Sequence, residues 1–171
     1  MMKPTLSFLL VVLCLSASAQ SASELYTNGQ KKFDGFYLMG KPSGHWVYWH
    51  ENGNKQAEGD FLSGKRTGVW TYYYPNGNPK EKGSLTNDKQ NGEWTYWHEN
   101  GKKKAVGLVR NDMQDRRWVY WYDNGKKERE GEWSYLDTNK RGHWSFWDMG
   151  GKLVKEEWYD PNGKLLKATS Y

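Results

Sequence analysis

Histidine followed by glutamate is the pair of residues in this sequence best suited to act as a general acid and base. The pair occurs as His50-Glu51 and again as His98-Glu99, each time directly before Asn-Gly. The repeat between them has Tyr74-Pro75 at the same position. Acid–base catalysis needs its groups to converge on one site, whereas these pairs recur along the chain. We therefore interpret them as polar hairpin tips and predict no catalytic residue and no enzymatic activity.

Metal and cofactor sites are not indicated either. A metal site needs three or four converging ligands, and the remaining histidines, His45 and His143, each stand alone before a tryptophan. The glycines do not open a helix, as those of a phosphate-binding loop would. The sequence thus predicts no bound metal and no cofactor.

The elements that position these residues are copies of one unit. The copy at 92–107 reads G-E-W-T-Y-W-H-E-N-G-K-K-K-A-V-G. Its turn asparagine recurs every 24 residues, at Asn28, Asn52, Asn76, Asn100 and Asn124. In the last full unit the turn is Gly150-Gly151, two residues late. Repeats of this length predict a chain in which each unit packs on its neighbours.

Each unit is predicted to be a β-hairpin. Asn-Gly is typical of a two-residue turn in which both residues have positive φ. Counting outward from that turn pairs each first tryptophan with a glycine on the facing strand. A tryptophan that lies across a strand glycine stabilises it. The predicted structural pairs are Trp46 with Gly59, Trp70 with Gly83, Trp94 with Gly107 and Trp118 with Gly131, while Trp144 meets Glu157.

The two faces of the sheet follow from the period-two alternation of strands. One face carries the tryptophans Trp46, Trp70, Trp94, Trp118 and Trp144, with Tyr48, Ala57 and Phe61. The other face is mostly polar, includes Gln56, and carries an aromatic row of its own: Trp49, Tyr73, Trp97, Trp121 and Trp147. We predict an all-β protein, an elongated single-layer antiparallel meander of about 13 strands.

The N-terminus is predicted to be a secretory signal peptide, residues 1–19. A basic start precedes an apolar run at 6–15, which is too short to span a bilayer, and Ala17-Ser18-Ala19 is typical of a cleavage site. We therefore expect export to the periplasm, the cell envelope or the medium. Residues 20–43 are expected to form an atypical capping repeat, well formed only near 33–38. Five hairpin repeats fill 44–159, and 160–171 adds a C-terminal capping hairpin strand.

Composition supports a chain without an aliphatic core. Mean hydropathy is −1.03, yet the chain has 11 Trp, 12 Tyr and 19 Gly. The only cysteine, Cys14, lies in the predicted signal peptide, so no disulfide is expected. Net charge is +5, and removal of Lys3 would lower it by one. In the cell envelope this charge favours anionic lipid, anionic polymer or an acidic protein over nucleic acid.

The unit G-x-W-x-Y-[YW]-x-x-N-G-x-x-x-x-x-G resembles the MORN repeat variant, across residues 26–168. That variant is found in bacterial envelope proteins and in YwqK-like antitoxins. The resemblance implies a single-layer sheet of hairpins and, through the antitoxin name, a non-catalytic partner that binds a toxin. The broader group is associated with membrane contact and scaffolding.

Two functions from different classes are consistent with these features. The first is a secreted, non-enzymatic protein-binding scaffold, such as an immunity factor, whose partner is an unknown protein or a second copy of the chain. The alternative is a cell-envelope module that binds carbohydrate or anionic lipid; the pattern also loosely resembles choline-binding cell-wall repeats. The candidate binding residues are the aromatic row from Trp49 to Trp147 and the basic hairpin tips with Lys102, Lys103 and Lys126.

Overall fold

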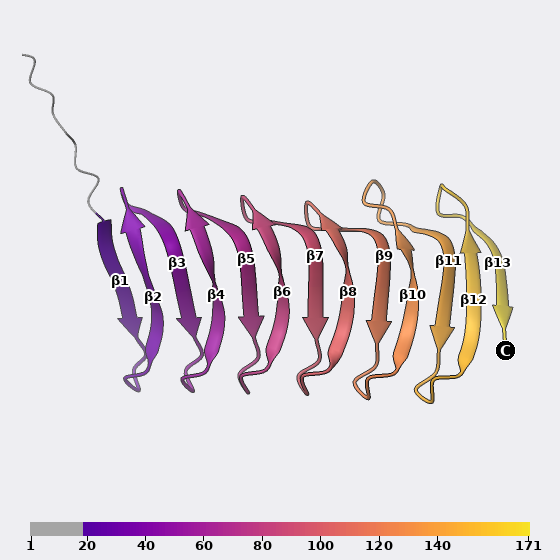
Figure 1. Ribbon diagram of the computed structural model, residues 1–171, viewed down its shortest axis with the longest axis horizontal. Coiled ribbons are helices and arrows are strands. Elements are labelled where there is room, and N and C mark those ends of the chain that lie inside the picture. The colour runs from indigo at the N-terminus through magenta and orange to yellow at the C-terminus, as the bar shows by residue number, and fades with distance from the viewer. Residues whose placement is uncertain (1–18) are drawn as a thin grey trace, which may run out of the picture.

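The computed structural model describes residues 19–171, which form thirteen β-strands (Figure 1). The predicted signal peptide lies outside the described residues except for Ala19, the first residue of β1. The strands are β1 (Ala19–Leu25), β2 (Lys31–Leu38), β3 (Lys41–Trp49), β4 (Lys55–Leu62), β5 (Lys65–Tyr73), β6 (Pro79–Thr86), β7 (Lys89–Trp97), β8 (Lys103–Arg110), β9 (Met113–Trp121), β10 (Lys127–Trp133), β11 (Lys140–Trp147), β12 (Leu153–Tyr159) and β13 (Leu165–Ser170).

The strands make one open antiparallel sheet in sequence order, which confirms the predicted meander. The predicted register is also confirmed, because Trp46 pairs with Gly59 and Trp144 with Glu157. Strand β12 pairs with both β11 and β13, so it serves two hairpins. At the other end β1 is more regular than expected, and it pairs with β2 along its length.

The Asn-Gly turns differ from the prediction. Gly53 N–H donates to His50 O (2.9 Å) and His50 N–H donates to Asn54 O (2.8 Å), so residues 50–54 form a five-residue loop. Only Gly53 has positive φ (86°); Asn52 does not. The loop makes Trp49 pair with Lys55 and leaves Gln56 bulged out of the ladder. This is a type I turn closed by a glycine in the left-handed region, and it preserves the register beyond the bulge.

Asparagine is present at the turn for its side chain rather than for its backbone. Asn52 Oδ1 accepts from Asn54 N–H (3.1 Å), while its Nδ2 donates to Pro75 O (2.6 Å) on the next tip. The corresponding donors and acceptors at the other tips are Asn28 to Glu51, Asn76 to Glu99, Asn100 to Asp123 and Asn124 to Met149. These bonds join successive hairpin tips along one edge of the molecule.

Each strand that carries a buried tryptophan has a β-bulge, which begins two residues before the tryptophan. In β5, Gly68 and Val69 add two residues opposite Gly59, and Gly68 has a φ of 67°. Glycine adopts this left-handed conformation without steric cost. In β9 the equivalent position is Arg116, which has a φ of 57°.

The core is built on one row of buried indoles, joined by a few smaller residues such as Leu85 and Val109. Trp46, Trp70, Trp94, Trp118 and Trp144 are at most 2 % exposed. The ring that covers each glycine belongs to the following strand and not to its own hairpin, which corrects the predicted stacking. A Cβ on Gly83 would lie 2.3 Å from Cδ2 of Trp94, and Trp94 Nε1–H donates to Ser84 O (3.2 Å). Each hairpin is thereby packed onto the next, which is how a single-layer sheet buries its core.

Among residues 19–171 no helix is long and apolar enough to cross a membrane.

Candidate binding surfaces

The face that carries the five buried indoles, here called the tryptophan face, also carries a second aromatic row. It consists of Tyr48, Tyr72, Tyr96, Tyr120 and Phe146 on alternate strands. Between each two neighbouring rings, the intervening strand contributes one residue that pairs with both ring residues. In strand order these residues are Ala57, Glu81, Ala105 and Arg129. Small and large residues therefore alternate between the rings.

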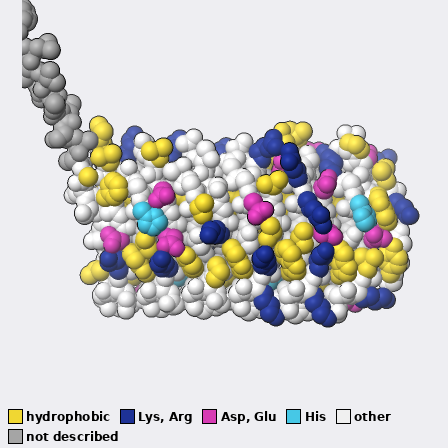
Figure 2. All heavy atoms as spheres, in the orientation of Figure 1, with side chains coloured by type: hydrophobic (Ala, Val, Ile, Leu, Met, Phe, Trp, Pro, Cys, Tyr) yellow, Lys and Arg dark blue, Asp and Glu magenta, His cyan; other side chains and the backbone are white. Residues whose placement is uncertain are grey.

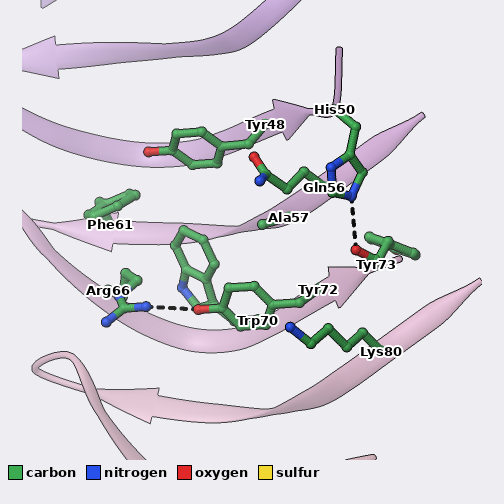
Figure 3. Close-up of a pocket in the computed structure, with 10 residues that line it drawn as sticks. All are labelled: Tyr48, His50, Gln56, Ala57, Phe61, Arg66, Trp70, Tyr72, Tyr73 and Lys80. Carbon is green, nitrogen blue, oxygen red and sulfur yellow. Dashed lines mark hydrogen bonds between the residues drawn. The ribbon is translucent and has the colours of Figure 1, made fainter. Parts of the chain in front are cut away.

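A hollow of about 380 Å³, here called hollow 1, lies over Ala57 (Figure 3). Tyr48 and Tyr72 flank it, and Trp70 also lines it. Lys80 reaches into it from β6. Hollow 1 exists because alanine leaves open the space between two tyrosine rings.

A second hollow, hollow 2, has a volume of about 420 Å³ and lies over Ala105. Tyr96 and Tyr120 flank it, and Trp118 occupies the place of Trp70. Hollow 2 is therefore the copy of hollow 1 two repeats later. Glu81, at the equivalent position in the repeat between, lies on the border of hollow 2.

The two His-Glu pairs of the sequence lie in the same two repeats as the hollows. His50 lines hollow 1 and His98 lines hollow 2. His50 Nε2–H donates to Tyr73 O (3.0 Å) and His98 Nε2–H donates to Trp121 O (2.8 Å), since a carbonyl only accepts. Tyr74 OH makes the same bond to Trp97 O (2.9 Å). Each histidine ties its repeat to the next one, which supports the interpretation that they belong to hairpin tips.

The rim of hollow 1 is cationic. Arg66 donates to Tyr72 OH (2.9 Å) and to Asp88 Oδ1 (3.0 Å). Burial alone would lower the pKa of Arg66, but its bonds to Asp88 and Tyr72 outweigh burial and raise that pKa. Burial raises the pKa of Tyr72 and of Tyr48, so both rings are neutral at physiological pH.

Hollow 2 has more charge around it. Lys80, Lys104 and Arg129 are cations in its lining, and Glu81 and Glu128 are acids. Arg129 lies 4.2 Å from the Tyr120 ring centroid and 3.5 Å from Glu128 Oε1. Its Nε is buried and has no hydrogen-bond partner among residues 19–171. Burial raises the pKa of Tyr96 to about 12, and burial also raises the pKa of Glu81.

The predicted binding row from Trp49 to Trp147, here called the outer row, follows the strand alternation onto the opposite face, but Tyr73 also lines hollow 1 and Trp97 also lines hollow 2. Its rings are half-buried. Lys31 Nζ lies 5.3 Å from the Trp49 centroid, and Lys127 Nζ lies 4.8 Å from that of Trp147. Tyr73 OH donates to Glu58 Oε1 (2.6 Å). Figure 2 shows hydrophobic side chains in a band across the strands near the Asn-Gly tips, with lysines and arginines gathered over β8–β10.

The basic tips are partly engaged within the sheet. Lys102 Nζ donates to Asn124 O (2.9 Å), and Lys126 Nζ donates to Gly150 O. They replace Asn54 and Asn78, whose shorter side chains also donate to the next tip, at the carbonyl one position earlier. Lys103 is exposed at the start of β8. These lysines therefore extend the chain of bonds between tips as well as adding charge.

The hollows are not predicted by strand alternation, which assigns residues to faces but does not show how side-chain size differs between repeats at one position. Strand alternation predicts Gln56 on the polar face, yet the bulge turns it into hollow 1. The available signal was that an alanine, Ala57 or Ala105, stands four residues after His-Glu-Asn-Gly in two repeats. The other two repeats have Glu81 and Arg129 at the equivalent position. A 48-residue period in residue size was thus readable in the sequence.

Within residues 19–171 no three histidine, cysteine, aspartate or glutamate side chains gather as a metal site.

Comparison with known proteins gives a family match. The model described as the MORN repeat variant matches residues 42–62, 66–87, 90–111 and 152–171. No curated protein sequence matches the chain. A crystal structure of a protein of unknown function from Bacteroides fragilis is similar over 91% of this chain and 94% of that chain. Its sequence identity is 8% and its TM-score 0.17, too low to support any argument.

Proposed function

Because this chain belongs to the MORN repeat variant family, we propose that it is a non-enzymatic scaffold that binds a partner protein through its tryptophan face. The repeats form one layer, so neither face is covered by a second sheet or by helices within residues 19–171. A sheet of this kind offers a long, regular surface for another molecule.

The observation that supports this function most strongly is the pair of equivalent hollows. Both combine aromatic walls with an alanine floor and have more cations than carboxylates in their lining. Apolar concavities lined by a few polar groups are the usual form of binding sites. Three of the four flanking tyrosine hydroxyls already bond within the sheet: Tyr72 OH accepts from Arg66, and those of Tyr96 and Tyr120 donate to Gln90 and Gln114. These three tyrosines therefore present ring faces rather than hydroxyl groups to a partner.

A second candidate function rests on the outer row. Its aromatic residues alternate with lysines across the sheet, since Trp49 pairs with Lys55, Trp97 with Lys103 and Trp121 with Lys127. Rings beside cations suit an anionic glycan in the cell envelope. Two of these lysines are paired with acids, Lys55 with Glu58 (2.7 Å) and Lys127 with Glu130 (3.2 Å), which weakens this alternative.

Affinity capture with face-specific variants tests the proposal. The baits are the native chain, Ala57→Gln/Ala105→Gln, and Trp121→Ala, each incubated with cell-envelope extract. Glutamine fills each hollow with an uncharged side chain of the same size as Glu81, which the sheet already accommodates at the equivalent position. We expect one protein at near-equal stoichiometry on the native bait and on Trp121→Ala, and its loss from the filled bait.

Other patterns would contradict the proposal. A protein retained equally by the filled bait would show that the hollows do not bind it. Retained glycan that is lost only from Trp121→Ala would favour the envelope-binding module. Unfolding curves of all three baits establish that each is folded.

A further inference from the structure

We propose that hollows 1 and 2 together bind one extended, acidic segment of a partner protein, with two bulky apolar side chains six residues apart. This inference rests on the proposed function and adds the chemistry and spacing of the partner. One side chain enters each hollow, and carboxylates of the segment lie near the cations between them.

The spacing follows from the register. Hollow 1 is centred on Ala57 in β4 and hollow 2 on Ala105 in β8, four strands further along the sheet. Neighbouring strands are about 4.8 Å apart, so the hollows are roughly 19 Å apart along the sheet. A β-like segment spans about 3.3 Å per residue and a polyproline II segment about 3.1 Å. Either conformation covers the distance in about six residues.

Six residues also give the correct direction for both side chains. Side chains of a β-strand return to the same side every two residues, and those of polyproline II every three. Six is a multiple of both periods. Residues i and i+6 therefore point the same way in either extended form, whereas residues i and i+5 do not.

The charges indicate an acidic segment. The lining of hollow 1 contains Arg66 and Lys80 and, among the described residues, no carboxylate. Lys80 lines both hollows, so a cation lies on the path between them. Hollow 2 adds Lys104 and Arg129 against Glu81 and Glu128, so within residues 19–171 the linings of the two hollows together hold four cations and two carboxylates. Complementary charge of this kind favours an acidic partner and speeds its association.

The size and aromatic lining of the hollows indicate which side chains of the partner segment enter them. Each hollow is at the small end of the range of ligand pockets, so it accommodates part of a ligand, such as one large side chain. Two tyrosine rings and a tryptophan favour an aromatic or large aliphatic group. Between the hollows, Glu81 occupies the space where a third anchor would enter.

Synthetic peptides test the inference directly. The probe is a dye-labelled peptide of about 14 residues with Trp at positions i and i+6 in an Asp, Ser and Gly background, matched to the extended span. One control moves the second Trp to i+5, and another replaces Asp by Lys. Binding to the folded native chain is followed by fluorescence anisotropy. We expect the i+6 acidic probe to bind about tenfold or more tightly than either control, because both anchors engage together.

Variants then assign the two anchors. Ala57→Gln and Ala105→Gln should each remove the advantage of the i+6 probe. The matched control Val69→Leu, which enlarges an exposed side chain on the opposite face, should leave that advantage unchanged. Thermal unfolding of each variant is measured first, and the residues at the equivalent positions, Glu81 and Arg129, show that the sheet accepts a large side chain there.

Three results would overturn the inference: no binding of the probe, equal affinity for the i+6 and i+5 probes, or an advantage that survives in either glutamine variant. Failure here is distinguishable from failure of the scaffold function. If the filled bait loses its captured protein while the probes show no i+6 preference, the scaffold function stands and the extended acidic segment is wrong.

Discussion

The indole of Trp94 lies flat against Gly83 of the preceding strand, so closely that a Cβ on that glycine would be 2.3 Å from Trp94 Cδ2. The same contact recurs at every repeat, from Gly35 with Trp46 to Gly131 with Trp144. No side chain larger than hydrogen fits beneath the ring. This contact is the joint between hairpins, because ring and glycine come from different repeats.

Gly83→Ala should therefore destabilise the sheet by roughly 2–4 kcal/mol, since the added methyl group must displace a fully buried indole. Urea unfolding followed by tryptophan fluorescence measures the cost. Gly150→Ala is the matched control, because its Cβ would meet only Asp148 Oδ1 at 3.0 Å, the end of a half-buried side chain rather than a buried ring. Equal destabilisation by the two substitutions would show that the indole does not pack on Gly83 in this way.

Most of the fold was predictable because the repeat provides independent copies of each signal. The recurrence of Asn-Gly and of Trp at 24 residues predicted the hairpins, their register and the meander. The prediction that each glycine is covered by the ring of its own hairpin is wrong, because pairing across one ladder does not show to which side an indole leans. The Trp94 contact depends on the bulge at Gly92 and Glu93, which has no signature beyond a glycine.

Arg116→Gly should stabilise the protein. Arg116 has a φ of 57°, which costs an L-residue about 1–2 kcal/mol, and the equivalent positions in β3, β5, β7 and β11 are glycines with positive φ. The greater freedom of glycine in the unfolded chain offsets part of the gain, so we expect a net increase of about 0.5–1 kcal/mol in the free energy of unfolding.

Arg117→Gly is the control for that measurement. Arg117 lies one residue further on, lacks positive φ, and pairs with Glu130 (2.9 Å), so its replacement should destabilise. A loss of stability on Arg116→Gly comparable to that of Arg117→Gly would contradict the strain at Arg116.

His50→Tyr should be close to neutral, whereas His50→Phe should cost about 1 kcal/mol. Tyr26, Tyr74 and Tyr122 occupy the same position in other repeats and donate to the equivalent carbonyls of Trp49, Trp97 and Trp147 at 2.8–2.9 Å. Phenylalanine keeps the ring and loses the donor. Thermal unfolding distinguishes the two variants, and an equal loss of stability in both would show that the hydrogen bond is not what His50 contributes.

Acid should weaken the C-terminal end of the sheet through Glu157. Burial alone would raise the pKa of Glu157, but bonds from Lys155, Tyr159 and Lys140 outweigh burial and lower that pKa from 4.5 to about 2. A lowered pKa means that the unfolded chain binds the proton more tightly. The contribution of Glu157 is therefore complete above pH 4.5 and is lost as pH falls toward 2, by roughly 1–3 kcal/mol.

Glu157→Gln should flatten stability against pH across that window, while Glu93→Gln, at an exposed position of β7, should not. Urea midpoints measured at intervals between pH 5 and pH 2 give the comparison. A slope in Glu157→Gln identical to that of the native chain would exclude Glu157 as its source.

The candidate site was less predictable than the fold. The outer row was visible because Trp and Tyr recur there in every repeat. The hollows depend instead on what is missing, a side chain larger than alanine at Ala57 and Ala105. Their location on the tryptophan face also depends on the bulge that turns Gln56 and Lys80 toward that face.

Photo-crosslinking from the two faces of one strand tests most directly which face binds. A photoreactive amino acid replaces Lys80, which lines both hollows, or Lys82, which pairs with Thr71 on the opposite face of β6. After irradiation in cell-envelope extract, the two chains are compared for cross-linked protein. The scaffold account predicts one cross-linked partner from position 80 and none from position 82. The same partner from position 82 alone would contradict it and assign binding to the outer row.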